Sequence, residues 1–531
     1  MADSEEFDIV VIGGGSGGSA AAGRLSEGGQ YSVCLIEAGG RNTGYRTIIP
    51  GFVAFQTPKT NWAFETVPQP GLNGRRGYQP RGKGLGGSSA INGMVYIRGN
   101  AWDYDNWAAM GCAGWSYADV LPYFKAAERN VRGGDDHHGG NGPLWVSEQI
   151  SPNPGSLDFV EAGASLQIPR NDDFNGARQE GIGLFQVTQK NGERWSAARA
   201  FVEPAVAAGR LHVLTDVTAE RVLFEGKRAV GVAYSRKGRA SQVRARKAVI
   251  LAGGAFGTPQ LLMLSGIGPA GHLRDHGIEV VVDRPAVGAN LQDHLDYSAA
   301  FECDDTRFLG QSLTGLFNSA KAVVQWFRTR SGAMTTNYAE AGGFLKLDPD
   351  APAPDVQLHF FPVALEDHGR TVVKAHGYSG HVCVLRPESQ GTVRLASNKA
   401  TDAPLIDPAF LSDDRDMVLL KKGVKAMYRI MEAAPLSDYR GRDRNPVDLD
   451  DDAALEDRIR NRADTIYHAV GTARMGSDDN AVCDPQLRVR GVEGLYVADA
   501  SIMPKLVSGN TTAPTIMIGE RCADFVRADL G

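Results

Sequence analysis

Residues 7–18, FDIVVIGGGSGG, constrain the fold of this chain more than any other stretch. The apolar run 9–12 is too short to cross a membrane and has the length of a parallel strand that is covered on both faces. Glycines follow at the G-x-G-x-x-G spacing, which permits a tight turn, the approach of a pyrophosphate to the backbone and close packing of a helix predicted at 19–26. These glycines are Gly13, Gly15 and Gly18.

A second predicted strand, residues 31–37 (YSVCLIE), distinguishes this motif from a glycine-rich surface loop. It ends in an acid, Glu37, nineteen residues after Gly18, where a ribose hydroxyl needs an acceptor. A surface loop would explain neither the flanking strands nor the acid. The N-terminal segment is therefore predicted to bind a dinucleotide, with the N-terminus of the following helix aimed at its phosphates.

Length and charge restrict the class of protein. A chain of 531 residues is too long for one core, so two domains are expected. The net charge of -6 provides no basic surface for nucleic acid. The six cysteines include no C-x-x-C pair, which argues against a zinc site or a disulfide framework and favours a reducing compartment.

The location expected from the sequence is the cytoplasm. The first residues, MADSEEFD, are acidic and lead directly into the first strand, so no signal peptide is expected. No apolar run reaches the ~18 residues typical of a transmembrane helix.

A glycine-rich segment, residues 81–98 (RGKGLGGSSAINGMVYIR), has few apolar anchors of its own. Glycine permits close approach to a ligand, and successive N–H groups can form an anion-binding nest. We therefore expect this segment to contact the cofactor. Residues 38–80 before it are rich in Gly, Pro, Asn and Thr and predict an irregular excursion over the cofactor, in which Trp62 and Phe64 are either core residues or the wall of a pocket.

Five blocks in this order resemble the glucose-methanol-choline (GMC) family of FAD oxidoreductases, and the resemblance covers nearly the whole chain. Residues 81–99 are similar to the first signature of the family and residues 254–269, GAFGTPQLLMLSGIGP, to the second. The C-terminal blocks are YHAVGTARMG (467–476), GLYVADASIMP (494–504) and GNTTAPTIMIGER (509–521). By this resemblance the dinucleotide is FAD rather than NAD.

The implied fold class is α/β, a Rossmann-like FAD-binding domain with a second, α+β substrate-binding domain whose mixed or antiparallel sheet roofs the flavin. The FAD-binding domain is expected to be discontinuous (1–151, 209–300 and 453–531), and residues 152–208 and 301–452 form the substrate-binding domain. A β-rich meander with strands at 211–214, 220–224, 229–234 and 243–251 is predicted to lead back to the parallel sheet. In the substrate-binding domain we expect strands at 355–361 and 381–387, a loop at 366–379 and a helix at 415–431.

The resemblance also implies which residues contact FAD. Asp499 and Ala500 hold the ribityl and pyrophosphate groups, and Val217 contacts the adenine through its backbone. A helix that begins at Thr511 faces the pyrimidine ring, where its dipole and free N–H groups stabilise the negative charge of the reduced flavin. The remaining contacts implied are Gly84, Gly87, Ser88, Asn92, Gly93, Met94, Val95 and Thr512.

Oxidation of an alcohol by hydride transfer to flavin N5 requires a base for the hydroxyl proton. Histidine, with an unperturbed pKa of ~6.5, suits this task, but the chain has eleven and residue type selects none of them. The resemblance implies His468 as the base and Asn510, at a position that is His or Asn in the family, as its partner. An amide can orient the substrate oxygen but cannot act as a second base.

Two departures from the family narrow the prediction. Ile91 occupies the place of a histidine that attaches FAD covalently in some members, which implies noncovalent FAD. Residues 354–370 and 377–395 resemble the bacterial alcohol dehydrogenase branch, whose members oxidise aliphatic, polyether or related primary alcohols. Choline dehydrogenases have a similar pattern, but a quaternary ammonium requires an aromatic cage, which a sequence alone does not assemble.

The branch favours a dehydrogenase that passes electrons to a quinone or dye-type acceptor, with an alcohol oxidase that forms hydrogen peroxide as the alternative. Hydroxynitrile lyases share the fold and use their flavin without redox chemistry, so a lyase is a further alternative. An NAD-dependent dehydrogenase fits least, because it would leave both signatures without a role.

The segment from Leu313 carries apolar residues at helical spacing, with basic residues nearby. Such a helix can lie on the inner face of the membrane, as expected for an enzyme that reduces a quinone, or pack on its own domain, which is the commoner arrangement. The sequence does not predict the oligomeric state. The apolar positions are Leu316, Phe317, Ala320, Val323, Val324 and Phe327, and the basic ones are Lys321, Arg328 and Arg330.

One other polar cluster contains potential metal ligands. Asp135, Asp136, His137 and His138 lie in a Gly-rich loop that matches a family loop without metal, so no metal is expected there.

Overall fold

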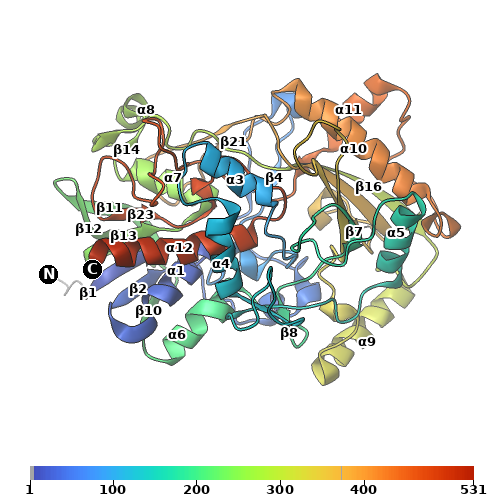
Figure 1. Ribbon diagram of the computed structural model, residues 1–531, viewed down its shortest axis with the longest axis horizontal. Helices are drawn as coiled ribbons and strands as arrows, with labels where there is room; N and C mark the ends of the chain where they lie inside the picture. Colours follow the sequence, from blue (N-terminus) through green and yellow to red (C-terminus); the bar gives the residue numbers. More distant parts are fainter. Residues whose placement is uncertain (1–4, 372) are drawn as a thin grey trace.

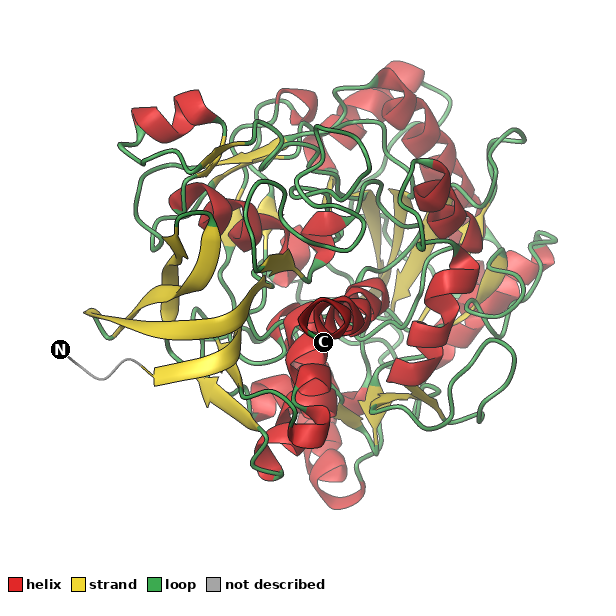
Figure 2. Ribbon diagram, turned by 60° about the vertical axis from the view of Figure 1, so that its left-hand side comes forward, coloured by secondary structure: helices red, strands yellow, loops and turns green. Residues whose placement is uncertain are grey.

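A computed structural model of the protein describes residues 5–371 and 373–531. Its longer strands form two sheets, which lie on the left and the right of Figure 1 and stand apart as two yellow groups in Figure 2. Residues 1–4, which belong to the acidic N-terminal stretch, lie outside the described residues, as does residue 372 within the expected loop 366–379.

The first sheet has seven strands and carries the glycine motif at the end of β1. Strands β10, β2, β1 and β13 lie side by side in parallel, and β23 pairs in parallel with the last residues of β13. The meander strands β12 and β11 continue antiparallel from the first half of β13. The bounds are β1 Glu5–Ile12, β2 Val33–Ile36, β10 Leu211–Leu214, β11 Thr218–Glu225, β12 Arg228–Arg236, β13 Arg239–Leu251 and β23 Leu495–Val497.

The centre of this sheet is buried on both faces, as the apolar runs predict. Residues 9–12 of β1 and all four residues of β2 are buried, which is the pattern of a parallel sheet covered by helices. Helix α1 (Ser16–Leu25) begins three residues earlier than expected, with Gly15 as its N-cap. Gly18 therefore lies inside the helix, where a Cβ would be 1.9 Å from the carbonyl oxygen of Gly13.

The second sheet has six antiparallel strands in the order β22-β16-β19-β18-β17-β7. One expectation is wrong here: residues 376–379 are not loop but the start of β19, so the strand expected at 381–387 begins five residues earlier. Pairing with β16, in which Phe301 faces Tyr378, holds this glycine-containing stretch in the sheet despite its weak strand propensity. The bounds are β7 Gly181–Leu184, β16 Leu295–Cys303, β17 Ala341–Leu345, β18 Val356–Phe361, β19 His376–Val384 and β22 Asp464–Thr465.

The two faces of the second sheet differ in composition. On β18, Val356, Leu358 and Phe360 are buried in one core with residues of helix α10 (Asp414–Glu432), which is capped by Asp413. Helix α5 (Pro154–Ser165) covers the same face beside α10. Because side chains alternate along a strand, Gln357 and His359 point to the opposite face, toward the first sheet.

Each sheet has its own core. The larger core contains the first sheet, α1 and the C-terminal helix α12 (Thr512–Leu530), and the other contains the second sheet, α5 and α10. The residue boundaries expected for the two domains stay a prediction.

The remaining elements are shorter helices and strands outside the two large sheets. The helices are α2 Tyr45–Ile48, α3 Ala101–Ala109, α4 Tyr117–Ala127, α6 Glu203–Ala207, α7 Gly254–Leu264, α8 Ala270–Asp275, α9 Leu313–Thr329 and α11 Asp452–Arg462. The short strands are β3 Phe64–Glu65, β4 Tyr78–Gln79, β5 Glu128–Asn130, β6 Leu144–Val146, β8 Gln189–Lys190, β9 Glu193–Arg194, β14 Ile267–Gly268, β15 Val282–Asp283, β20 Thr392–Arg394 and β21 Leu405–Asp407.

Helix α9 lies at the lower edge of the molecule in Figure 1. It packs inward through Gly315, Ala322 and Trp326, while Leu313 and Phe317 are 88% and 71% exposed. Among the described residues, the helices all lack the combination of length and apolar character that crossing a bilayer requires.

Candidate active site

A cavity of about 1140 Å³ extends from the glycine turn after β1 to the inner face of the second sheet. Gly13 and Gly15 line one end, and His359 and His468 line the other. Pockets for drug-sized ligands have volumes of roughly 300–1,000 Å³. This cavity is therefore large enough for an elongated ligand such as a dinucleotide, with space for a second, small molecule.

The end of the cavity at the glycine turn suits a pyrophosphate. Gly13 has φ +103°, and a Cβ there would lie 2.3 Å from the carbonyl oxygen of Ala252, so only glycine fits the turn. Among the described residues no side chain caps α1. Its first N–H groups therefore remain available to an anion.

Glu37 holds three backbone segments together at this end. Its carboxylate accepts hydrogen bonds from the N–H groups of Gly14 (2.8 Å), Gly39 (2.9 Å) and Gly84 (2.9 Å). Glu37 also lines the cavity. The acid predicted to bind the ribose therefore also holds the surrounding loops in place through these hydrogen bonds.

Two of the predicted FAD contacts do not line the cavity. Gly18 packs against Gly13, and Gly84 donates its N–H to Glu37, so the contribution of each is to place the residues that do line it. The predicted contacts that line the cavity are Gly13, Gly15, Glu37, Gly87, Ser88, Asn92, Gly93, Met94, Val95, Val217, Asp499, Ala500, Thr511 and Thr512, together with His468 and Asn510.

Asn92 connects the first signature to the start of α12. Its amide nitrogen donates to the hydroxyl of Thr512 (3.0 Å), and its oxygen accepts from a guanidinium nitrogen of Arg194 (2.8 Å). Arg194 is fully buried, and burial lowers its pKa to about 9. It thus fixes the amide that faces the cavity.

Asp499 makes a similar connection for the second signature. One carboxylate oxygen accepts from the N–H of Gly254 (2.9 Å) and from the hydroxyl of Thr258 (2.5 Å). The other oxygen accepts from the N–H of Ser501 (2.8 Å). The end of β23 and the start of α7 are thereby held at one side of the cavity.

The N-terminus of α12 opens onto the cavity. Thr511, Thr512 and Thr515 line it, and no side chain among the described residues caps this helix. Its free N–H groups and its dipole give this wall a positive potential, which suits a ring that becomes negatively charged.

His468 lies between the start of β16 and the start of α12. It follows β22 and Tyr467, whose φ is +76°, and its N–H donates to Asp293 (2.8 Å). Its Nδ1 is 2.9 Å from Nδ1 of His294, and its Nε2 is 3.1 Å from the amide nitrogen of Asn510. The predicted base and its predicted partner are therefore in contact.

The hydrogen bonds around His294 assign the tautomer of His468. Nε2 of His294 lies 3.0 Å from the carbonyl oxygen of Leu385, which can only accept, so this nitrogen carries the proton. Nδ1 of the neutral His294 must then accept from Nδ1–H of His468. The lone pair of His468 is therefore on Nε2, the nitrogen beside Asn510.

Burial keeps these histidines neutral. It lowers the pKa of His468 well below 6.5, and the nearby His294, His359 and Arg81 lower it further. Burial likewise lowers the pKa of His294 and of His359 to about 3. A neutral His468 is the form that can accept a proton.

The strand register supplies two residues that sequence reasoning missed. Gln357 donates to the amide oxygen of Asn510 (3.0 Å), which directs the NH2 group of Asn510 toward His468. His359 is buried and lines the cavity, and its Nδ1 has no hydrogen-bond partner among the described residues. The alternation of polar and apolar residues on β18 was a signal for both, whereas none pointed to His294.

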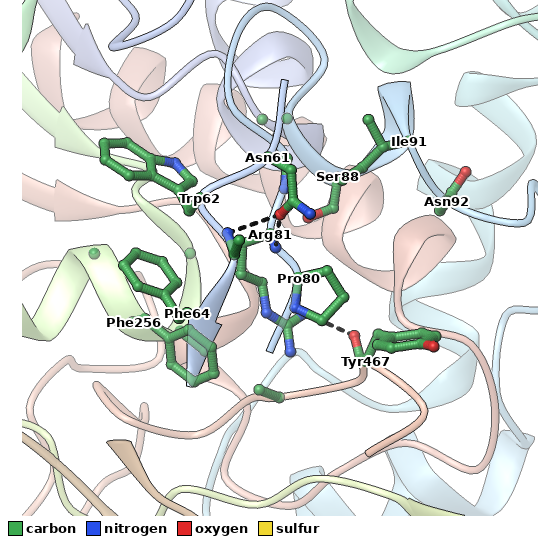
Figure 3. A pocket seen from close by; sticks show the side chains of 18 of the residues that line it. Asn61, Trp62, Phe64, Pro80, Arg81, Ser88, Ile91, Asn92, Phe256 and Tyr467 are labelled. Atoms are coloured by element: carbon green, nitrogen blue, oxygen red, sulfur yellow. Dashed lines mark hydrogen bonds between the residues drawn. The ribbon is translucent and has the colours of Figure 1, made fainter. Parts of the chain in front are cut away.

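Aromatic side chains form another wall, shown in Figure 3. Trp62 and Phe64 stack with ring centroids 5.7 Å apart, and Phe64 meets Phe256 edge to face. Trp62 and Phe64, the two aromatic residues considered in the 38–80 excursion, both line the cavity, and Phe64 also packs against a small core cluster that contains Phe256. Arg81 lies over Phe256 at 4.9 Å and donates to the carbonyl oxygen of Tyr467 (2.7 Å).

The polar loop 135–138 has a different environment. His138 is buried, with Nε2 2.9 Å from Asp173 and Nδ1 3.2 Å from Glu128. These carboxylates raise its pKa to about 9, so both ring nitrogens are occupied by ion pairs.

Comparison with known proteins assigns the chain to a family. The GMC oxidoreductase family model for the N-terminal part matches residues 7–296, and the model for the C-terminal part matches residues 387–519. The chain belongs to the GMC oxidoreductase family. Its FAD-binding fold is thereby confirmed, and the glycine turn, the two uncapped helices and the cavity volume all fit FAD.

Two curated relatives of this GMC oxidoreductase match almost end to end. It is 44% identical to "Alcohol dehydrogenase [acceptor]" of Pseudomonas putida, over 98% of this chain and 95% of that one. It is 42% identical to "Oxygen-dependent choline dehydrogenase" of Brucella suis, with the same coverage. Among solved structures, pyridoxine 4-oxidase from Mesorbium loti is 31% identical with a TM-score of 0.87, covering 97% of this chain and 98% of that one. A formate oxidase variant of Aspergillus oryzae is 27% identical with a TM-score of 0.92, covering 100% and 99%.

The lowered pKa of His468 predicts an unusual pH dependence. A base must be neutral, and a histidine of ordinary pKa would be half protonated near pH 6.5. Because the pKa of His468 lies well below that value, the rate of flavin reduction by alcohol should stay on its plateau as the pH falls through 6.5. Anaerobic rapid mixing between pH 5 and 9 measures this rate; halving near pH 6.5 would contradict the assignment.

The variant His294→Phe tests whether His294 positions His468. The measurement is again the rate of flavin reduction as a function of pH. The substitution removes the acceptor of Nδ1–H and one group that lowers the pKa of His468, so the acidic limb should move toward pH 6.5. The plateau rate should fall roughly tenfold, as expected for one lost hydrogen bond. His212→Phe, a surface change on β10, is the matched control and should alter neither quantity.

Proposed function

We propose that this protein is an FAD-dependent alcohol dehydrogenase in which His468 is the catalytic base. The observation that carries the proposal is the position of His468, which lines the cavity with Nε2 beside the amide of Asn510 and Nδ1 beside His294, so that its lone pair is assigned to Nε2. Its curated relatives named alcohol dehydrogenase and choline dehydrogenase support oxidation of a CH–OH group.

The side chains at this end of the cavity define the proposed chemistry. Noncovalently bound FAD would supply the acceptor for the hydride. The NH2 group of Asn510 faces Nε2 of His468. An alcohol bound between the two side chains replaces this hydrogen bond: Asn510 donates to the alcohol oxygen, and the hydroxyl donates to Nε2 of His468, which takes its proton. His294 keeps the other imidazole proton on Nδ1, and Gln357 keeps the NH2 group of Asn510 turned inward.

The residues around the cavity favour a neutral alcohol over choline. Lys83 lies over the ring of Trp62 at 4.4 Å and Arg81 over that of Phe256, so cations already occupy two of the aromatic faces in the cavity wall that could bind a quaternary ammonium. The nearby carboxylate of Asp296 pairs with His381 at 2.7 Å. Within the described residues, the acids that line the cavity are either bonded to backbone N–H groups (Glu37, Asp499) or exposed (Glu65, Asp402).

A quinone or a dye is proposed as the electron acceptor, with oxygen as the alternative. The name "Alcohol dehydrogenase [acceptor]" of the relative supports the first choice. We propose a cytoplasmic location with peripheral contact at the inner face of the membrane, where a lipophilic quinone is available.

The first prediction concerns the reaction itself. Adding primary alcohols to the yellow protein without oxygen should bleach the flavin band, because electrons leave the alcohol for the flavin. Choline should bleach it more slowly, because no free carboxylate among the described cavity residues is placed to bind its positive charge. A band that no alcohol changes, in a protein that cleaves a cyanohydrin, would favour the hydroxynitrile lyase.

Replacement of the base and its partner should have unequal effects. His468→Ala should slow flavin reduction at least ~10²-fold, as expected for loss of a general base, with FAD still bound by its absorbance. Asn510→Ala should cost less, because it removes one hydrogen bond and leaves the base. A larger loss for Asn510→Ala would reverse the two roles.

The attachment of FAD is predicted from Ile91, which lines the cavity and has no nucleophilic atom. Acid precipitation should release all of the flavin into the supernatant. Yellow colour that stays in the washed pellet would show a covalent bond elsewhere.

The acceptor is tested by reoxidation of the alcohol-reduced protein in a stopped-flow instrument. A soluble quinone analogue should reoxidise the flavin much faster than air-saturated buffer does. Equal rates, with hydrogen peroxide formed in step with the aldehyde, would make the protein an oxidase.

A further inference from the structure

One flank of the exposed side of α9 is apolar, which is unusual for a surface helix. Leu313, Leu316, Phe317, Val324 and Phe327 are all exposed and lie along this flank. The exposed polar and basic residues of α9, among them Asn318, Lys321, Gln325 and Arg328, lie along the other flank. A helix of a water-exposed surface normally turns its polar residues outward.

A second segment extends this face. The ring of Phe327 meets that of Tyr45 edge to face, with centroids 5.3 Å apart, and Tyr45 is 61% exposed. Phe52 packs against the cluster that anchors α9, and Phe55, which is 58% exposed, lies against Phe52. We call this set the α9 surface: Tyr45, Phe55, Leu313, Leu316, Phe317, Val324 and Phe327. Apolar patches of this kind mark binding sites.

The two segments that form the α9 surface carry more positive than negative charge. Neither residues 38–64 nor residues 306–339 contain an Asp or a Glu, in a chain with 62 of them. Glu193 is paired with Arg330 at the end of α9. Arg41, Arg46, Lys59, Lys321 and Arg328 lie in the two segments, are exposed, and form no ion pair with any described residue. A basic rim around an apolar centre complements a layer of anionic lipid headgroups over acyl chains.

The α9 surface also adjoins the cavity. Residues 53, 54, 56 and 57, next to Phe52 and Phe55, line the cavity from inside. Tyr338, which follows α9, donates its hydroxyl to the carbonyl of Gly51 and lines the cavity too. The segment 51–57 thus contributes to the cavity wall and also lies against the cluster that anchors α9.

We propose that the α9 surface binds an anionic lipid bilayer, with the outward side chains of α9 among the acyl chains and the basic rim at the headgroups. The proposal defines the surface that makes the membrane contact proposed above. Only the purpose of this contact, access to a quinone in the membrane, rests on the proposed function. Self-association is less suited to this face, because a two-fold interface would bring the basic rim against its own copy.

Sedimentation with vesicles tests the proposal on the FAD-loaded protein. The protein should bind vesicles of phosphatidylglycerol and phosphatidylcholine, and bind at least tenfold less to phosphatidylcholine alone. Leu316→Ser/Phe317→Ser and, separately, Lys321→Glu/Arg328→Glu should each reduce the partition coefficient at least tenfold. Leu157→Ser/Val418→Ser, which changes exposed apolar residues on α5 and α10, is the matched control and should bind as the unchanged protein does.

Three results would overturn the proposal. They are absence of vesicle binding by the unchanged protein, equal binding by the α9 variants, and a dimer that becomes a monomer in Leu316→Ser/Phe317→Ser on size exclusion. Alcohol oxidation with a soluble dye should be unchanged in all variants, which shows that they fold. Failure of alcohol to reduce the flavin would refute the proposed function and leave the vesicle result intact.

Discussion

Direct backbone contact between α1, α12 and the end of β23 determines the architecture of the cavity. A Cβ at Gly17 would lie 2.0 Å from the carbonyl oxygen of Ala498, and one at Gly519 would lie 2.2 Å from that of Gly17. The three elements therefore touch without intervening side chains. This contact brings the N-termini of both helices to one cavity, one near the glycine turn and the other near His468, so the phosphate end and the reactive end share a single rigid support.

The second sheet completes the cavity because its faces are used differently. The apolar face of β18 supplies the core under α10, and stability depends on it. The opposite face carries Gln357 and His359, which a shift in register by one residue would exchange for Val356 and Leu358. Packing and chemistry are therefore coupled along the same six residues: the burial that fixes the register also fixes the amide of Asn510 through Gln357.

The sequence predicts those parts of this arrangement that depend on residues close together in the chain, and it does not predict those that depend on residues far apart. The glycine turn, the buried strands of the first sheet and α10 follow from short-range patterns, and the structure confirms them with small shifts at their ends. The start of β19 was missed because its pairing with β16 overrides weak propensity. Eleven histidines were equivalent until family resemblance selected His468. His294 is 174 residues from its partner, and its role depends on the carbonyl of Leu385, so no local pattern contains it.

The hydrogen-bond chain that orients His468 also determines where its proton goes. The chain runs from Nδ1–H of His468 to His294 and ends at the carbonyl of Leu385, which can accept but not pass on a proton. A proton passed onto His294 would find no further acceptor at the other end of the ring, because Leu385 offers only a carbonyl oxygen. A proton taken by Nε2 therefore returns through the cavity, the side from which it came. Access of water or acceptor to the cavity therefore controls how soon the base is neutral again, and Trp62, Phe64 and residues 53, 54, 56 and 57 are among the residues that line it.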